Sequence, residues 1–139
     1  GGVGLFTSQF LNEIGDTGTV DLVEGSKSAT ADAMRNFADF FNVSVHTGDV
    51  AKLLPRFSVA DVIVLDPPRE GAGKDVVTEM VALKPRAIVY VACDPAALAR
   101  DTNYLGEAGY QLQEMRAFDL FPMTHHIESV ALFTPVKVS

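Results

Sequence analysis

The amino-acid sequence predicts an α/β fold: a mostly parallel β-sheet covered by helices, with an antiparallel hairpin at its C-terminal end. Apolar segments of strand length alternate with amphipathic segments of helix length, which is the pattern of parallel strands joined by helices. The last third differs, because two apolar segments near residues 111–118 and 126–133 leave no room for a helix between them. Such closely spaced strands pair antiparallel, so we expect a hairpin at the sheet edge.

The parallel strands are expected at four apolar segments that end in polar residues or turn formers. They cover residues 19–24, 43–46, 60–65 and 87–92. Helices are expected where apolar residues recur at three- and four-residue spacing, after a capping residue such as Ser26. The apolar residues that mark these helices are Phe6, Phe10, Leu11 and Ile14, then Met34, Phe37, Ala38 and Phe41, then Val76, Val77, Met80 and Val81, and finally Leu98, Leu105 and Ala108 before Gly109.

The composition indicates one globular domain. The 139 residues are 47% hydrophobic, which suits a single packed core and excludes a disordered segment. A formal net charge of -7 disfavours strong nucleic-acid binding by this chain alone. The single cysteine excludes an internal disulfide and fits a reducing cytoplasm. No apolar run approaches the roughly 20 residues of a membrane span, so no membrane partner is expected.

The first residues suggest a cofactor site and an origin in a longer protein. Gly1, Gly2 and Gly4 form a turn that normally follows a buried strand, so we expect the sheet's first strand to precede residue 1. Such glycines let backbone N–H groups approach a ligand, although a tight turn without a ligand is the alternative. Glu24 ends a strand about 20 residues later, where a carboxylate commonly binds ribose hydroxyls. Together they indicate an adenosine-containing cofactor.

Two further acids follow strands. Asp49, after His46-Thr-Gly, is a candidate acceptor for an adenine amino group, and a simple turn is equally compatible with it. In Asp66-Pro-Pro-Arg69, the prolines hold the backbone extended and keep Asp66 at the strand end. Arg69 is a candidate phosphate or carboxylate partner. A purely structural loop is the alternative for this segment.

Cys93 follows an apolar strand and precedes Asp94 and Pro95, which suit the N-cap and first position of a helix. A lone cysteine in such a place is usually a small core residue. The positive end of the helix dipole, however, favours a thiolate there, and Asp94 opposes that effect.

Glu128 starts the last strand among apolar residues, and is either a paired structural acid or a proton acceptor. His125 and His126 stand far from the only cysteine, so a metal site is not expected. His46 has no candidate partner in the sequence, which favours a structural role.

Five segments together resemble the bacterial RNA uridine-C5 methyltransferases. They are Gly1–Thr7, Val23–Lys27, Asp61–Gly73, Tyr90–Asp101 and Phe118–Leu132, and they span nearly the whole chain. The specific motifs are Asp-Pro-Pro-Arg, Cys-x-Pro-x-x-Leu-Ala-Arg-Asp and Phe-Pro…His-x-Glu. The resemblance implies a Rossmann-like class I methyltransferase fold that uses S-adenosyl-L-methionine. It implies these roles: Gly2, Gly4, Glu24 and Asp49 bind the cofactor, Asp66 lies between cofactor and target base, Cys93 is the nucleophile, and Glu128 is the base.

The sequence departs from the family pattern in places. The family more often has Ser-Cys-Asn-Pro where this chain has Ala92-Cys-Asp-Pro95, and a threonine at Ala97, so a hydrogen bond to substrate is in doubt. The N-terminal regions that bind RNA in the family, and that carry an iron–sulfur cluster in some members, are absent from this sequence. We therefore expect a catalytic piece. It should bind cofactor weakly or not at all by itself, because the strand that would support the glycine turn is missing.

The implied chemistry explains these residue types. Uracil C5 is a weak nucleophile, and addition of a thiolate at C6 converts the ring to an enolate that C5 can use for attack. A base then removes the C5 proton so that the cysteine can leave. The uridine must be accessible, so a loop or single-stranded site is expected, in ribosomal RNA ahead of transfer RNA.

Three alternatives compete with this interpretation. A nicotinamide-dependent oxidoreductase would share the glycines and Glu24. Its motif needs a third glycine that this chain lacks, and it gives no role to Cys93. An amino-group methyltransferase also uses an acid followed by Pro-Pro, but needs no thiol. The third alternative is a binding module without catalytic activity.

Overall fold

The computed structural model describes residues 19–24, 42–47, 61–67, 69–121 and 126–136. The expected glycine turn, the first two helices and Asp49 lie outside these residues. No helix within the described ranges is long and apolar enough to cross a membrane.

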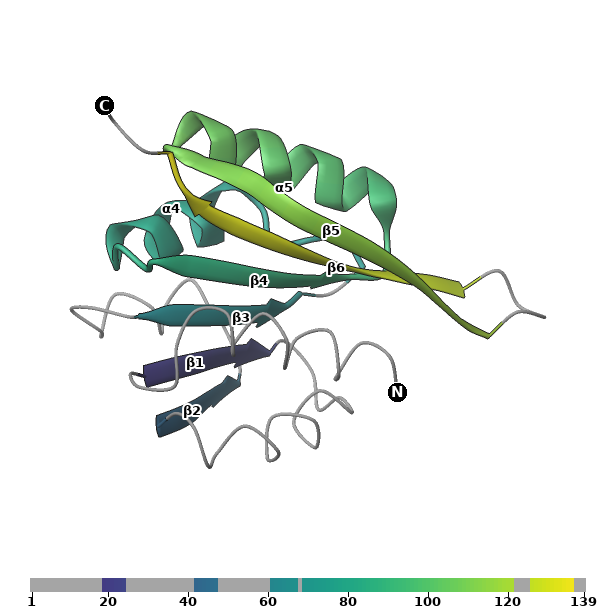
Figure 1. Cartoon of the computed structure of the whole chain (residues 1–139), viewed down its shortest axis with the longest axis horizontal. Coiled ribbons are helices and arrows are strands. Elements are labelled where there is room, and N and C mark those ends of the chain that lie inside the picture. The colour runs from purple at the N-terminus through teal and green to yellow at the C-terminus, as the bar shows by residue number, and fades with distance from the viewer. Residues whose placement is uncertain (1–18, 25–41, 48–60, 68, 122–125, 137–139) are drawn as a thin grey trace.

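The described strands form one six-stranded sheet in the order β2-β1-β3-β4-β6-β5 (Figure 1). Their bounds are β1 Thr19–Glu24, β2 Asn42–Thr47, β3 Val62–Asp66, β4 Ala87–Ala92, β5 Tyr110–Phe121 and β6 His126–Pro135. The first four strands pair in parallel, whereas β6 runs antiparallel to both β4 and β5. The expected mostly parallel sheet with a C-terminal hairpin is therefore confirmed.

Two helices cover one face of this sheet (Figure 1). They are α4, Lys74–Ala82, which follows β3, and α5, Pro95–Glu107, which follows β4. Their apolar residues pack with those of the strands in one core: Ile63, Leu65, Val77, Met80, Leu83, Ile88, Tyr90, Ala92, Leu98, Leu105, Tyr110, Ala131 and Phe133. Full burial of a side chain such as Phe133 stabilises the fold by roughly 1.5–3 kcal/mol. This core fixes the helices on the sheet, and with them the loops that leave its strands.

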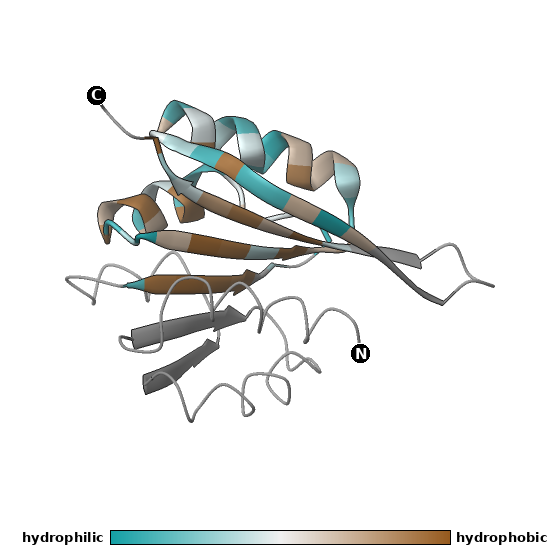
Figure 2. Cartoon of the chain, viewed as in Figure 1, coloured by the Kyte–Doolittle hydropathy of each residue, from teal (hydrophilic) through white to brown (hydrophobic). Residues whose placement is uncertain are grey.

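The strands in the middle of the sheet are buried on both faces. Ile63 and Leu65 of β3 join the helix-side core, whereas Val62 and Val64, which alternate with them, are also fully buried. β4 is buried along its whole length. Figure 2 shows the corresponding difference in hydropathy, with β3 and β4 mainly apolar and β5 alternating between apolar and polar residues. A central strand that is apolar at every position is typical of a parallel sheet covered on both sides.

The hairpin of β5 and β6 lies at the sheet edge, and its free end extends past the carboxyl ends of the parallel strands (Figure 1). β5 begins one residue earlier than expected and continues to Phe121, and β6 continues to Pro135. The two strands were predicted from their apolar segments, but their pairing continues past those segments. The longer pairing keeps the backbone groups there hydrogen-bonded. The expected β3 also needs correction, because it begins at Val62 and includes Asp66.

The helix assignments hold with one correction. Val77 and Met80 of α4 are buried, and Val76 and Val81 pack against the core while partly exposed. Ala108 was expected within the last helix, but α5 ends at Glu107 and Ala108 is its exposed C-cap. Gly109, with φ 94°, then turns the chain into β5. Glycine adopts this left-handed conformation without steric cost, which explains the stop that the sequence indicated.

Candidate active site

Three of the candidate residues lie at the carboxyl ends of neighbouring parallel strands (Figure 1). Glu24 is the last residue of β1 and is paired in register with Asp66, the last residue of β3. Cys93 directly follows Ala92, the last residue of β4. In open α/β sheets ligands bind at this edge. The structure therefore brings together, at one edge, three residues that are far apart in the sequence.

Glu128 reaches the same edge from the antiparallel hairpin. It is paired with Phe118 of β5, and its neighbour Ser129 is paired with Ala92 of β4. The pairing of β4 with β6 ends at Ala92 and Ser129, and Cys93 and Glu128 are the next residues beyond that pair on the two segments. The hairpin thus brings Glu128 to the same end of the sheet as Cys93.

The turn that carries Cys93 is organised by the start of α5. Asp94 is the N-cap, with an extended backbone, and its Oδ1 accepts a hydrogen bond from the backbone N–H of Ala96 at 3.0 Å. Pro95 occupies the first turn of the helix, as expected from the sequence. Cys93 is a free, exposed thiol although the six residues before it are all buried. Its exposure excludes the alternative of a small core residue.

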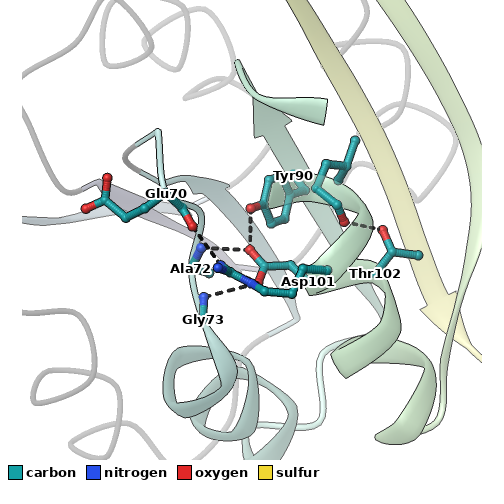
Figure 3. Close-up of polar contacts among 8 residues, drawn as sticks. Glu70, Ala72, Gly73, Tyr90, Asp101 and Thr102 are labelled. Carbon is teal, nitrogen blue, oxygen red and sulfur yellow. Dashed lines mark hydrogen bonds and ion pairs between the residues drawn. The ribbon is translucent and has the colours of Figure 1, made fainter. Parts of the chain in front are cut away.

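A buried aspartate, the last residue of the Cys-x-Pro-x-x-Leu-Ala-Arg-Asp motif, lies behind this turn, and nothing in the sequence indicated a role for it. Asp101 of α5 has no exposed surface, and its Oδ2 accepts hydrogen bonds from Tyr90 Oη at 2.5 Å and from Ala72 N at 2.7 Å. Its Oδ1 accepts from Gly73 N at 3.2 Å (Figure 3). A buried charge needs such partners to be tolerated. Asp101 therefore joins β4, α5 and the loop after β3 at one carboxylate.

Arg100 completes this cluster from the solvent side. Its guanidinium forms an ion pair with Asp101 Oδ1 at 3.1 Å and donates to the carbonyl oxygen of Glu70 at 2.7 Å. The hydrogen bond and the negative charge of Asp101 raise the pKa of the Arg100 guanidinium. Burial raises the pKa of the Tyr90 phenol well above its ordinary value, and the bond to Asp101 raises it further. Tyr90 consequently remains a hydrogen-bond donor at neutral pH.

Gly71 explains how the loop lies so close to α5. Its φ of +88° is in the left-handed region, and a Cβ there would lie 2.7 Å from both Arg100 Nη2 and Asp101 Oδ2. Only a residue without a side chain fits this close approach. The prolines after Asp66 indicated irregular backbone here, but the sequence did not indicate that this glycine packs against residues of α5.

The remaining candidates are placed as follows. Arg69 is exposed in the loop between β3 and α4. Gly2, Gly4, Asp49 and His125 lie outside the described residues, whereas His46 and His126 belong to β2 and β6. Among the described residues, Glu24 and Asp66 are the acids whose strand-end positions suit the hydroxyl groups of a nucleoside cofactor.

Comparison with known proteins identifies the family. The family model for tRNA (uracil-5-)-methyltransferase matches residues 7–136. An uncharacterized RNA methyltransferase of Streptomyces avermitilis is 52% identical over 136 residues, covering 96% of this chain and 31% of the relative. One from Streptomyces coelicolor is 48% identical, with 96% and 30% covered. The chain thus spans about a third of the length of these relatives.

A solved structure shares the fold. The tRNA (uracil-54, C5)-methyltransferase of Pyrococcus abyssi, in complex with S-adenosyl-L-homocysteine, superposes with a TM-score of 0.66 at 22% identity. The superposition covers 94% of this chain and 38% of that one. The sheet with its C-terminal hairpin is accordingly a Rossmann-like class I methyltransferase fold. Because the family model matches nearly its whole length, this chain belongs to the tRNA (uracil-5-)-methyltransferase family.

Proposed function

We propose that this chain is the catalytic part of a longer RNA methyltransferase that methylates C5 of a uridine through a covalent cysteine adduct. The observation that carries the proposal is the exposed thiol of Cys93 at the carboxyl end of β4, with Glu128 of β6 one residue beyond the last pair of these two strands. A packing role would bury this thiol, and a methyltransferase acting on amino groups would not need it. A reducing cytoplasm, which keeps the only cysteine of the chain free, is the compartment that we propose.

The cofactor that we propose is S-adenosyl-L-methionine, which supplies an electrophilic methyl group. Support comes from the family and from the ligand of the Pyrococcus abyssi enzyme. Within this chain, Gly2, Gly4, Glu24 and Asp49 are proposed to hold the cofactor, and Asp66 to lie between cofactor and uracil. The register of Glu24 with Asp66 supports a shared binding site at that edge. Arg69, exposed in the next loop, is proposed to contact the RNA.

The proposed reaction assigns one task to each side chain. The thiolate of Cys93 forms a bond to uracil C6, and the electrons of the C5–C6 double bond pass to the O4 enolate. C5 then attacks the methyl group that the bound cofactor would supply, and the cofactor would leave as its demethylated thioether. The resulting adduct is saturated and still carries the C5 proton. Glu128 removes this proton, the double bond re-forms, and the Cys93 sulfur leaves C6. A base is therefore needed for release of the product but not for attachment of the cysteine.

The test is covalent trapping in the full-length protein. Fluorine at C5 cannot leave as a proton, so RNA that contains 5-fluorouridine should form a stable complex with the protein when S-adenosyl-L-methionine is present. Cys93→Ala should form none. Glu128→Gln should accumulate the adduct even with ordinary uridine RNA, because only the release step is blocked. If Cys93→Ala still methylates its RNA at the wild-type rate, the mechanism is wrong.

The substrate RNA is tested separately. We expect the uridine in ribosomal RNA, whereas the family description names transfer RNA. Mass spectrometry of 5-methyluridine in each purified RNA from a strain without the gene distinguishes the two. The RNA that loses the modification is the substrate, and an unchanged content in both contradicts the proposal.

A further inference from the structure

We propose that Asp101 is a positioning residue, which holds the loop after β3 at a fixed place relative to Cys93. The inference rests on the proposed function, in which this loop contacts the substrate and Cys93 attacks it. It concerns a residue that lies behind the reacting groups and does not touch them.

The first argument is that Asp101 fixes both sides of the cysteine turn. Cys93 and Asp94 are the two residues between the end of β4 and the start of α5. Tyr90, on the strand side, donates its hydroxyl hydrogen to Asp101, on the helix side, at 2.5 Å. The turn is thus closed by a buried hydrogen bond between its two flanking elements. A short turn between two joined elements has little freedom to move.

The second argument is that the same carboxylate fixes the loop that begins with Asp66. The N–H groups of Ala72 and Gly73 both donate to Asp101, and Glu70 is tied to Arg100 through its carbonyl oxygen. At its other end the loop is fixed by the pairing of Asp66 with Glu24. Arg69 therefore lies on a segment that is anchored at both ends.

The third argument is that the contact is built by the sequence. Gly71, between the anchored residues, lies where any Cβ would be within 2.7 Å of the Asp101 carboxylate and the Arg100 guanidinium. A loop that packed loosely on α5 would need glycine here only for its positive φ and not for lack of space. The carboxylate has two oxygens with about four acceptor sites, and donors from the loop, the strand and Arg100 occupy both oxygens.

Asp101→Asn tests the proposal with little change in shape. The two loop donors bind different oxygens of the carboxylate, so in either orientation of the amide at least one loop N–H faces an NH₂ group. We expect the turnover number of the full-length enzyme to fall about 10- to 100-fold, the effect of small misplacements of reacting groups. The rate of trapping by 5-fluorouridine RNA should fall in parallel. The rate of alkylation of Cys93 by iodoacetamide should stay within about two-fold of wild type, because the reagent reaches an exposed thiol whether or not the loop is held in place.

Arg100→Gln is the second variant, and it keeps the proposal testable if Asp101→Asn fails to fold. The Arg100 side chain is 44% exposed, so its replacement leaves the core intact, but it removes the bond to Glu70. We expect the turnover number to fall about 3- to 10-fold, the rate of trapping to fall in parallel, and alkylation of Cys93 to change little.

Tyr110→Phe is the matched control for lost stability. Its hydroxyl is also buried and donates to the Pro85 carbonyl oxygen at 2.5 Å, but Tyr110 starts β5 at the opposite end of the sheet from Cys93 (Figure 1). This variant should have a lower melting temperature and an unchanged turnover number. An Asp101→Asn enzyme with wild-type turnover overturns the inference. It is also overturned if Tyr110→Phe loses as much turnover as Asp101→Asn does, or if alkylation of Cys93 in Asp101→Asn falls as much as turnover does. If instead the wild-type protein traps no RNA, it is the proposed function that fails.

Discussion

At the scale of single residues, some positions can be predicted from their neighbours in the sequence, whereas others become evident only in the fold. Cys93 was identified because its signals are adjacent: a strand before it, then Asp94 and Pro95. Asp101 belongs to the same motif, but its role could not be predicted, because its partners Tyr90 and Ala72 lie 11 and 29 residues away. An acid within an amphipathic helix ordinarily faces water. Its burial became evident only when α5 was placed on β4 and the loop was placed on α5.

Gly71 and Gly73 form a natural pair for separating backbone strain from crowding. Their φ angles are nearly equal, +88° and +85°, but a Cβ at Gly71 meets three atoms within 3.1 Å whereas one at Gly73 meets none within 4 Å. Gly73 has φ 85° and ψ 167°, a region that essentially only glycine adopts, so Gly73→Ala should cost about 1–3 kcal/mol in the free energy of unfolding from backbone strain alone. Gly71→Ala should cost about 1–3 kcal/mol more than its own backbone strain, since overpacking of a buried site adds to that strain.

Urea denaturation of both variants measures this difference. The midpoint concentration should fall for both, and further for Gly71→Ala, at an unchanged slope. Equal losses in the two variants would mean that the loop moves away from α5 without cost. Such a result would also weaken the case that the loop is held in place by Asp101.

At the scale of elements, the carboxyl end of β4 shows how much of a site can be predicted from neighbouring residues. The strand, the N-cap and the proline together specify where Cys93 stands relative to α5, and the structure agrees with all three. The position of Glu128 relative to Cys93 depends on the register of β4 with β6. The sequence indicated a hairpin but did not fix this register, because register depends on the pairing of whole strands.

The N-cap of α5 can be tested by two substitutions, one that removes the side-chain acceptor and one that keeps an oxygen acceptor in a side chain of the same shape. Asp94→Ala removes the acceptor for the Ala96 N–H and should lower the free energy of unfolding by about 1 kcal/mol. Asp94→Asn keeps an oxygen acceptor, and asparagine caps helices about as well as aspartate, so stability should change little. Thermal denaturation by circular dichroism measures both. A melting temperature that falls equally in the two variants would show that the negative charge, rather than the hydrogen bond, supports the helix start.

At the scale of the whole molecule, the sheet order explains why residues from four segments share one edge. β1, β3 and β4 are parallel, so their carboxyl ends coincide, and the antiparallel β6 begins where β4 ends. The alternation of strands and helices was sufficient to predict this edge as the binding site. The sequence could not indicate that the loop after β3 and the helix after β4 are joined there, since that depends on how their side chains pack.

The charge of the whole chain yields the last prediction. Eleven lysines and arginines stand against eighteen acids, for a net charge of -7, and affinity for RNA rises mainly with the number of phosphates that cations neutralise. We expect the 139-residue chain alone to bind RNA far more weakly than the full-length protein does. Fluorescence anisotropy with a labelled uridine-containing RNA loop measures both at two salt concentrations. The full-length protein should lose affinity steeply as salt rises, because counterions compete for the phosphates. If the isolated chain binds as tightly and with the same salt dependence, then RNA recognition resides in these residues, and the exposed Arg69 is the first position to examine.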